Sequence, residues 1–413
     1  METSLLCRKS PRRLVTPQLT SPQFISPAIL FAALLAAGTA SAENWEIAPR
    51  VEAGYRYSDN WHLGPPGTEV EVSGGETDAQ VAFRTLDPRT QIEITPRILA
   101  TYFPDAQDDD SVDGYLDGRF EDVTPRRRMG VTGSFAHETV TRSELPEGGD
   151  VGGGDLGNPA TGDSGRFIEH NKRDYLSVSP FISYDVTQRQ RLDFNAYYLQ
   201  ADFEKQLENA QQDFSEEGVE AGWGYRFSER SSLSVHALAS RYETTFDTDA
   251  YGAYLQWDTN FTENSRVYVR VGAQQTEPEN GASDTNAIGG IGGSWNNQRN
   301  TLFLDLTRTV EPVSAGTVVE RYQLRMRIHH DVSPRIALML GARASHDDSI
   351  DPASTFATRK YVAAEGGFEW RVLRDFAVTA TYSYRWQEYA DELSDRSANG
   401  FLVGFVYEPR RLN

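Results

Sequence analysis

From residue 46 onward, apolar and polar side chains alternate along the sequence with a period of two. In the segment 320–331, ERYQLRMRIHHD, one face carries Tyr322, Leu324, Met326 and Ile328. The other face carries Arg321, Gln323, Arg325, Arg327 and His329. The segments 266–274, 335–345 and 375–387 follow the same pattern. Successive side chains of a β-strand point to opposite faces, so this period predicts half-buried strands and an all-β fold.

Short polar segments recur between these strands, and one phrase recurs almost unchanged. It reads DVTPRRR at 122–128, DVTQRQRL at 185–192 and DVSPRIAL at 331–338. Ser, Thr, Asn, Asp and Pro followed by Arg are typical of tight turns. The predicted turns are DPR (87–89), TPRR (124–127), TQRQ (187–190), SERS (228–231), TENS (262–265), NQRN (297–300), SPR (333–335) and LRD (373–375).

The intervals between these turns each have room for a strand, a longer polar loop and a returning strand. Such segments of about 10 residues, with short turns on one side and long loops on the other, are typical of transmembrane up-and-down antiparallel β-barrels. Eight short turns predict about 18 strands, with short periplasmic turns and long extracellular loops. Sixteen strands are the alternative, because the pattern is weak at 112–122 and 284–296.

The first 42 residues have the features of a secretory signal peptide. Basic residues precede the apolar stretch 27–37, and the small residues 40–42 fit a cleavage site near Ala42. Residues 43–413 are then expected to form a single barrel domain, exported through the periplasm and integral to the bacterial outer membrane. The only cysteine, Cys7, lies in the predicted signal, so the mature chain would have no disulfide and no thiol chemistry.

Charge and hydropathy exclude two other classes of protein. No apolar run of 18 residues follows the N-terminal segment, which argues against helical membrane spans. The formal net charge of -20 argues against a nucleic-acid partner, since phosphates require a basic surface.

If the apolar faces contact lipid, the opposite faces line the barrel lumen. The residues predicted to face the lumen and to set the charge of the pore are Arg97, Arg270, Arg321, Arg325, Arg327, Arg343, Arg385, Glu365 and Glu369. A basic wall of this kind attracts anionic solutes, and guanidinium groups suit carboxylates and phosphates. The alternative is a structural ladder of ion pairs, in which Glu365, Glu369 and Asp305 neutralise the arginines. The sequence leaves both open.

The longest predicted loop, 141–170, is rich in glycine. A loop of this length is usually either functional or disordered. It could fold inward and narrow the pore, although its glycines favour disorder.

The acidic run 108–118 has a spacing close to that of a calcium-binding loop. Its ligand positions would be Asp109, Ser111, Asp113, Gly114 and Asp117. However, Phe120 occupies the position that needs a bidentate glutamate, and a strand pattern surrounds the run. We therefore expect a solvated acidic loop and predict no metal or cofactor site.

A catalytic site would need a nucleophile and a base within reach of each other. His236 shares a strand face with Ser234, but spacing along the chain implies no acidic partner for them. We therefore do not expect an enzyme.

Three prolines, Pro49, Pro96 and Pro180, fall inside predicted strands. Proline lacks the backbone N–H of the strand ladder, so it predicts a bulge near the periplasmic rim or a kink that shapes the lumen.

The segment APRVEAGYRYSDNWHL (48–63), together with the DVTxR and DVSPR turns, resembles a family of outer-membrane β-barrel porins associated with exosortase and extracellular-polysaccharide loci. The resemblance covers most of the mature chain. It implies an outer-membrane barrel near surface-polysaccharide machinery and assigns no catalytic residues. The chain departs from many such barrels at its end, where EPRRLN follows Tyr407.

These observations predict a porin-like channel for hydrophilic, anionic solutes or saccharides, linked to polysaccharide export. The alternative is a non-conducting barrel that anchors envelope polysaccharide machinery. The expected partners are outer-membrane lipid and lipopolysaccharide, the barrel-insertion machinery and an anionic saccharide. The sequence leaves open the solute, the oligomeric state and whether the pore is open, plugged or gated.

Overall fold

The computed structural model describes residues 45–143, 171–205, 211–279, 281–350, 358–391 and 394–409. The strands in these ranges are β1 (Trp45–Ser58), β2 (Val72–Thr85), β3 (Thr90–Tyr102), β4 (Ser111–Val123), β5 (Arg127–Thr139), β6 (Lys172–Asp185), β7 (Gln190–Phe203), β8 (Phe214–Arg226), β9 (Ser231–Glu243), β10 (Thr248–Thr262), β11 (Ser265–Pro278), β12 (Asp284–Asn296), β13 (Asn300–Val313), β14 (Thr317–Ser333), β15 (Ile336–Ser349), β16 (Arg359–Arg371), β17 (Phe376–Tyr389) and β18 (Arg396–Tyr407). Two single-turn helices, η2 (Gln107–Asp109) and α2 (Val140–Ser143), precede β4 and follow β5. Neither helix in the described ranges is long and apolar enough to cross a membrane.

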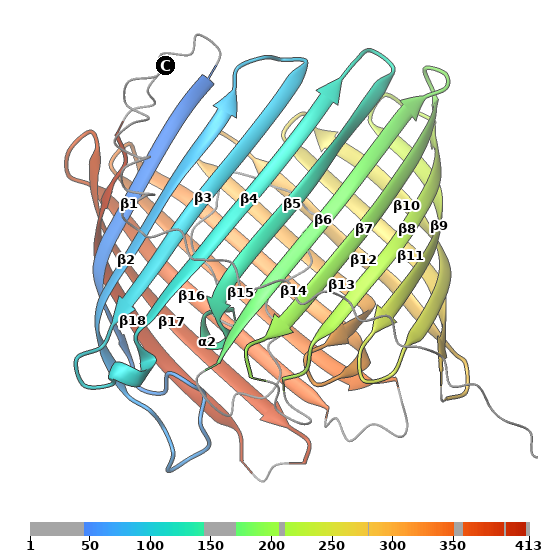
Figure 1. Cartoon of the computed structure of the whole chain (residues 1–413). Helices are drawn as coiled ribbons and strands as arrows, with labels where there is room; N and C mark the ends of the chain where they lie inside the picture. Colours follow the sequence, from blue (N-terminus) through green and yellow to red (C-terminus); the bar gives the residue numbers. More distant parts are fainter. Residues whose placement is uncertain are drawn as a thin grey trace, which may run out of the picture. The chain divides into compact units, whose positions relative to one another are not determined.

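The strands form one closed antiparallel sheet in which each strand pairs with its neighbours in sequence (Figure 1). Closure joins β1 to β18, from Val51 opposite Tyr407 to Ser58 opposite Gly400. The predicted all-β barrel of 18 strands is confirmed. The strands β4 and β12, whose weak pattern allowed a count of sixteen, are both present.

The two ends of the barrel differ, and the predicted tight turns all lie at one of them, the top in Figure 1. We call this the short-turn end and the opposite one the long-loop end. Polar side chains stabilise the turns: Thr187 Oγ1 accepts hydrogen bonds from the backbone N–H groups of Arg189 and Gln190 at 3.2 and 3.0 Å. Asp87 and Asn297 do the same in their turns. The repeated phrase is therefore a repeated turn between strands.

The outer face of the barrel is a continuous apolar belt. Many of the outward positions of the strands carry large, exposed hydrophobic side chains; those near mid-strand include Leu116, Phe135, Leu176, Val219, Val235, Leu255, Val271, Ile291, Leu304, Leu324, Leu340, Phe368 and Val403. Aromatic residues gather near the short-turn end of the belt: Tyr184, Phe227, Phe261, Trp295, Trp370, Phe376 and Tyr407. An apolar surface this large is stable only against hydrocarbon, so we treat the strands as membrane-spanning.

The prolines do not form the expected bulges. Pairing of β2 with β3 stops beside Pro96 and resumes two residues later in the same register, with Gln80 opposite Arg97 and Phe83 opposite Ile94. Pairing of β6 with β7 is interrupted in the same way beside Pro180. Pro49 lies opposite Val81, and the pairing of β1 with β2 continues through it without interruption. The missing N–H groups interrupt the ladder locally, and the neighbouring hydrogen bonds hold the register.

The alternation of faces can be tested with two adjacent residues of β15. Leu340 is exposed on the belt, whereas Met339 points inward. We expect Leu340→Arg to lower the free energy of unfolding by about 2–4 kcal/mol, because arginine near the membrane midplane is poorly solvated. Met339→Arg should cost much less, because the lumen is polar. Urea unfolding in lipid vesicles measures both, and equal losses would contradict the assigned faces.

Candidate functional site: the barrel lumen

All nine residues predicted to line the pore lie on the inner face of the sheet, alternating with the apolar belt. Arg325 and Arg343 occupy directly opposite positions on β14 and β15. Arg327 is the next inward residue of β14, and its exposed side chain lies opposite Gly341. We call Arg325, Arg327 and Arg343 the arginine row.

Acidic and aromatic side chains flank the arginine row on both sides. Asp305, opposite Arg325 on β13, accepts a hydrogen bond from Arg325 Nη2 at 2.7 Å and another from the Tyr268 hydroxyl. On the other side, the guanidinium of Arg343 lies over the ring of Tyr361, 5.4 Å from its centre. The row is therefore held by its neighbours and partly neutralised.

Glu365 is the second acidic neighbour of the row. Its side chain lies over Gly341, where a Cβ atom would come within 2.8 Å of Glu365 Oε1. Gly341 lies between Arg327 on one neighbouring strand and Glu365 on the other. Because it has no side chain, the Glu365 carboxylate has room to lie over it.

The other predicted residues engage separate partners. Arg97 binds Asp78 and stacks on Tyr115, and Arg270 donates to Gln256 and lies 4.4 Å from the centre of the Tyr254 ring. Arg321 is buried between Asp347 and Glu311. Glu369 pairs with Arg371 at 2.8 Å. The structure thus contains ion pairs along the wall together with one arginine-rich sector on β14 and β15.

Arg385 leads to a feature that the sequence analysis missed. Its Nη2 donates to the backbone oxygens of Asn60 and Trp61 at 3.3 and 2.9 Å, which belong to the loop between β1 and β2. That loop folds into the lumen, because Trp61 and Leu63 are 3% and 0% exposed. We call residues 59–64 together with α2 the inner block.

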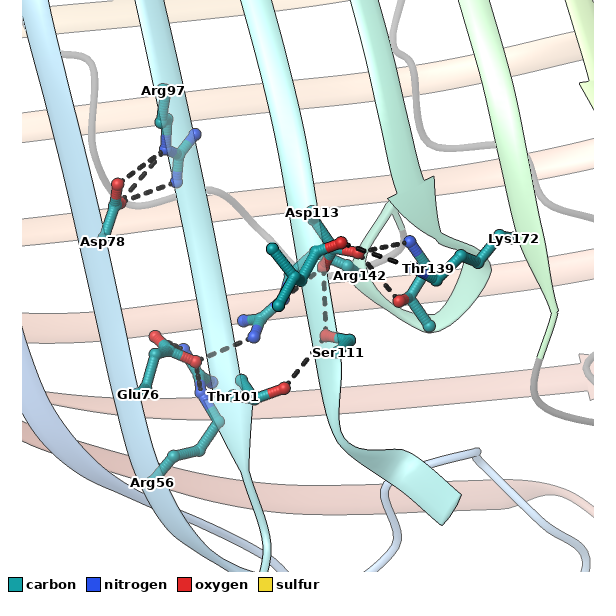
Figure 2. Close-up of polar contacts among 11 residues, drawn as sticks. Arg56, Glu76, Asp78, Arg97, Thr101, Ser111, Asp113, Thr139, Arg142 and Lys172 are labelled. Atoms are coloured by element: carbon teal, nitrogen blue, oxygen red, sulfur yellow. Dashed lines mark hydrogen bonds and ion pairs between the residues drawn. The ribbon is translucent and has the colours of Figure 1, made fainter. Parts of the chain in front are cut away.

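Arg142 of α2 holds the inner block against the barrel wall. Figure 2 shows it reaching Glu76 on β2, with Nη2 2.9 Å from Glu76 Oε2. Arg56 of β1 also binds this carboxylate. The guanidinium of Arg142 lies 5.5 Å from the centre of the Trp61 ring. Burial alone would lower the pKa of Arg142, but the negative groups around it, Glu76 foremost, together outweigh burial and raise that pKa above its ordinary value.

Two further contacts anchor the start of α2, one through Thr139 at the end of β5 and one through Thr141 of α2 itself. The backbone N–H and the hydroxyl of Thr139 both donate to Asp113 Oδ1 at 2.9 Å (Figure 2). The Thr141 hydroxyl lies 3.3 Å from His62 Nδ1. The predicted loop 141–170 therefore starts inside the lumen, and residues 144–170 lie outside the described part of the chain.

A second segment enters the lumen from the opposite wall. Strand β13 pairs with β12 only as far as Arg308 opposite Gly289, and its residues 309–313 pair with β14 alone. We call residues 309–319 the inward hairpin. At its tip, the oxygens of Ser314 and Gly316 accept hydrogen bonds from the backbone N–H groups of Gln212 and Thr245 at 2.7 and 3.3 Å.

Gly316 is required at this tip. Its φ of +78° is unfavourable for residues with a Cβ atom, and a Cβ there would collide with the side chains of Thr245 and Gln212. The Tyr242 hydroxyl adds a hydrogen bond to the Val310 oxygen at 3.1 Å. The hairpin is therefore fastened to β9 and to the segments just before β8 and β10.

One buried apolar cluster links distant parts of the wall through the inner block. Its members are Leu63, Ala136, Val140, Tyr175, Ala201, Phe203, Phe214, Tyr361, Ala363 and Ala398. They come from β5 to β8 on one side and from β16 and β18 on the other, with Leu63 and Val140 supplied by the inner block. Buried side chains of the described residues therefore bridge the lumen at the long-loop end.

The acidic run 108–118 does not form a calcium loop. From Ser111 onward it is the extended strand β4, so its residues do not curl around one point as the ligands of a calcium-binding loop do. It is not a solvated loop either, because Asp109, Ser111 and Asp113 are buried. Asp109 instead pairs with His62 Nε2 at 2.6 Å. Within the described ranges, no group of three or more His, Cys, Asp and Glu residues is arranged to hold a metal.

Three comparisons were made with known proteins, and only the comparison with solved structures found similar proteins, which are β-barrels. No protein-family model matches the chain, and no curated protein matches it. OccAB3 of Acinetobacter baumannii is 10% identical, covering 90% of this chain and 100% of that one, with a TM-score of 0.46. OpdO of Pseudomonas aeruginosa is 11% identical over 90% of this chain and 98% of that one, with a TM-score of 0.45.

A third solved structure is OccK2 (OpdF) of Pseudomonas aeruginosa in complex with glucuronate. It is 12% identical over 89% of this chain and 98% of that one, with a TM-score of 0.44. At these identities and TM-scores, the likeness carries no argument about what this chain binds or transports.

The anchoring of α2 can be tested by replacing Arg142 with methionine. The change removes one partner of a buried ion pair, so we expect a loss of about 3–5 kcal/mol in local stability. Hydrogen–deuterium exchange at the amides of Thr139 and Val140 should rise strongly. The matched control is Arg119→Met, which breaks the more exposed pair with Glu121. Unchanged exchange at 139–140 would show that Arg142 does not hold the inner block.

Proposed function

We propose that this chain is an outer-membrane channel of the porin type, with its short turns in the periplasm, that passes small hydrophilic anions. One observation carries the proposal: the arginine row, in which two arginines lie directly opposite each other beside a third on the lumen wall. Like charges in opposite positions destabilise a sheet, so folding alone does not explain the row.

The chemistry of the row suits a carboxylated or phosphorylated solute. Guanidinium groups offer paired donors that match the two oxygens of such an anion. A low-dielectric wall focuses the field of the row into the lumen and raises the local anion concentration. Partial neutralisation by Asp305 and Glu365 keeps binding weak enough for release, which conduction requires.

We further propose that passage is gated at the long-loop end. The inner block and the inward hairpin enter the lumen from opposite walls, and the apolar cluster fills the space beside them. A solute reaching the arginine row from the periplasm would pass outward only after one of these segments moves.

Acidic saccharides are the solute class we favour, with a role in surface-polysaccharide export. This finer proposal rests on a resemblance in sequence. The segment 48–63 and the repeated turns resemble porins associated with extracellular-polysaccharide loci. Loss of secreted polysaccharide in a deletion strain, restored by the wild-type chain, would support it. Normal secretion would refute it and leave the channel proposal standing.

A non-conducting barrel that anchors envelope machinery is the second candidate. The apolar cluster favours it, since buried side chains in the lumen stabilise a permanently closed barrel. The two functions differ in whether the lumen conducts ions when the inward segments are released.

Charge reversal tests the arginine row. We expect Arg325→Glu with Arg327→Glu to abolish anion preference or turn it into cation preference, because it reverses the charge along the wall. The reversal potential in a planar bilayer under a salt gradient measures this. Arg84→Glu is the matched control, since Arg84 is an inward arginine on β2, far along the sheet. Arg84→Glu changes the lumen charge by half as much as the double variant, so a shift half as large would show that only total lumen charge matters.

A disulfide tests the gate. Gln212→Cys with Ser314→Cys would join the inward hairpin to the start of β8, where the backbone atoms of the two residues are 2.7 Å apart. We expect conductance to be low when the pair is oxidised and to rise several-fold on reduction. Conductance that is absent in both states, and still absent when Arg142→Met releases the inner block, would favour the non-conducting barrel.

A further inference from the structure

Three polar side chains on the lumen wall form a continuous hydrogen-bonded line that channel function does not use. His236 Nδ1 lies 2.8 Å from Glu220 Oε1, and His236 Nε2 lies 2.9 Å from Ser234 Oγ. Ser234 and His236 are successive inward residues of β9, and Glu220 comes from β8. Both ring nitrogens are thus occupied, one by a carboxylate and one by a hydroxyl.

The register of β8 and β9 brings Glu220 to the histidine. Gly222 lies directly opposite His236, and a Cβ atom there would lie 2.6 Å from the imidazole ring. The glycine lets the ring lie flat against β8 and reach Glu220, the next inward residue. This partner could not be read from spacing along the chain, because it depends on how two strands are aligned.

Tyr254 of β10 fixes the ring from the other side. Its ring stacks on His236 with centres 4.6 Å apart and planes inclined by 7°. Its hydroxyl donates to the same Glu220 oxygen at 2.7 Å. The acceptor carboxylate places the imidazole proton on Nδ1, so Nε2 accepts the proton of the Ser234 hydroxyl.

The surroundings of Ser234 leave its hydroxyl accessible from the lumen. Gly224, directly opposite on β8, has no side chain to cover it, and Ser234 itself is only half-buried. On β10 the opposite residue is Gln256, which holds the guanidinium of Arg270 at 3.0 Å. Arg270 thus lies in register with Ser234 two strands away, with Gln256 between them.

We propose that Ser234, His236 and Glu220 form an esterase site for carboxylic esters of hydrophilic solutes in the lumen. A serine activated by a histidine that a carboxylate orients is the arrangement that nucleophilic acyl transfer needs. Arg270, two strands from Ser234, adds positive charge to the part of the wall where the transition state becomes negative. The proposal does not depend on conductance, since a solute need only enter from one side.

The reaction balances with water as the only co-reactant. Ser234 Oγ attacks the ester carbonyl carbon while its proton passes to His236 Nε2. The bond to the alcohol then breaks, and the alcohol leaves with that proton. His236 next takes a proton from water, whose oxygen attacks the acyl-serine. The carboxylic acid leaves, and the proton returns to Ser234. Glu220 remains ionised and acts as a positioning residue.

A fluorophosphonate probe tests the nucleophile on the purified full-length barrel in detergent. We expect covalent labelling at Ser234, located by peptide mass spectrometry, and hydrolysis of p-nitrophenyl acetate above the rate of the heat-unfolded protein. Ser234→Ala and His236→Gln should each lower that hydrolysis at least a hundredfold. The matched control is Ser232→Ala, an inward serine two residues away on the same strand.

The role of Glu220 is tested by a pair of variants. Glu220→Gln should lower hydrolysis at least tenfold, and Glu220→Asp should restore part of it, while both barrels keep the heat-modifiable gel migration of the folded protein. A folded barrel whose Ser234 is not labelled would overturn the proposal, as would hydrolysis that survives Ser234→Ala. In either case the three side chains would be a hydrogen-bonded part of the wall only.

Discussion

The structure depends on one constraint: backbone N–H and C=O groups inside hydrocarbon must be paired within the protein. A sheet satisfies this only if its first and last strands meet. Here Val51 to Ser58 of β1 pair with Gly400 to Tyr407 of β18, and the sheet closes. Closure sends one half of the side chains outward to lipid and the other half inward. The two-residue period of the sequence is the direct consequence.

The charged side chains that point to the inner face then need partners within the wall. Most arginines on it pair with carboxylates of neighbouring strands, as Arg97 does with Asp78 and Arg321 with Asp347. Cross-strand pairs of this kind stabilise the wall without giving it a net charge. The arginine row departs from this pattern, because Arg325 and Arg343 face each other. The proposed channel for anions would account for that departure.

The sequence predicts the features that depend on local pattern. Alternation predicted the strands other than β4 and β12, where the pattern is weak and the spacing of the turns indicated a strand. Turn chemistry at residues such as Thr187 and Asn297 predicted the short connections. It did not predict the inward hairpin or the inner block, because those depend on contacts between distant segments, such as Arg142 with Glu76. Gly316 in the tight segment between β13 and β14 was the available signal for the hairpin. Glu220 was missed for a similar reason, since cross-strand register decides which carboxylate meets His236.

We propose that the lumen is open to the short-turn end and closed at the long-loop end. The variant Arg327→Cys tests this. It gives the mature chain a single cysteine, because the only native one is Cys7 in the predicted signal. A membrane-impermeant thiol reagent is then added to one side of vesicles that hold the barrel in a known orientation. We expect fast modification from the short-turn side and slow modification from the long-loop side. Equal rates of modification from the two sides would show that the lumen is not closed at the long-loop end.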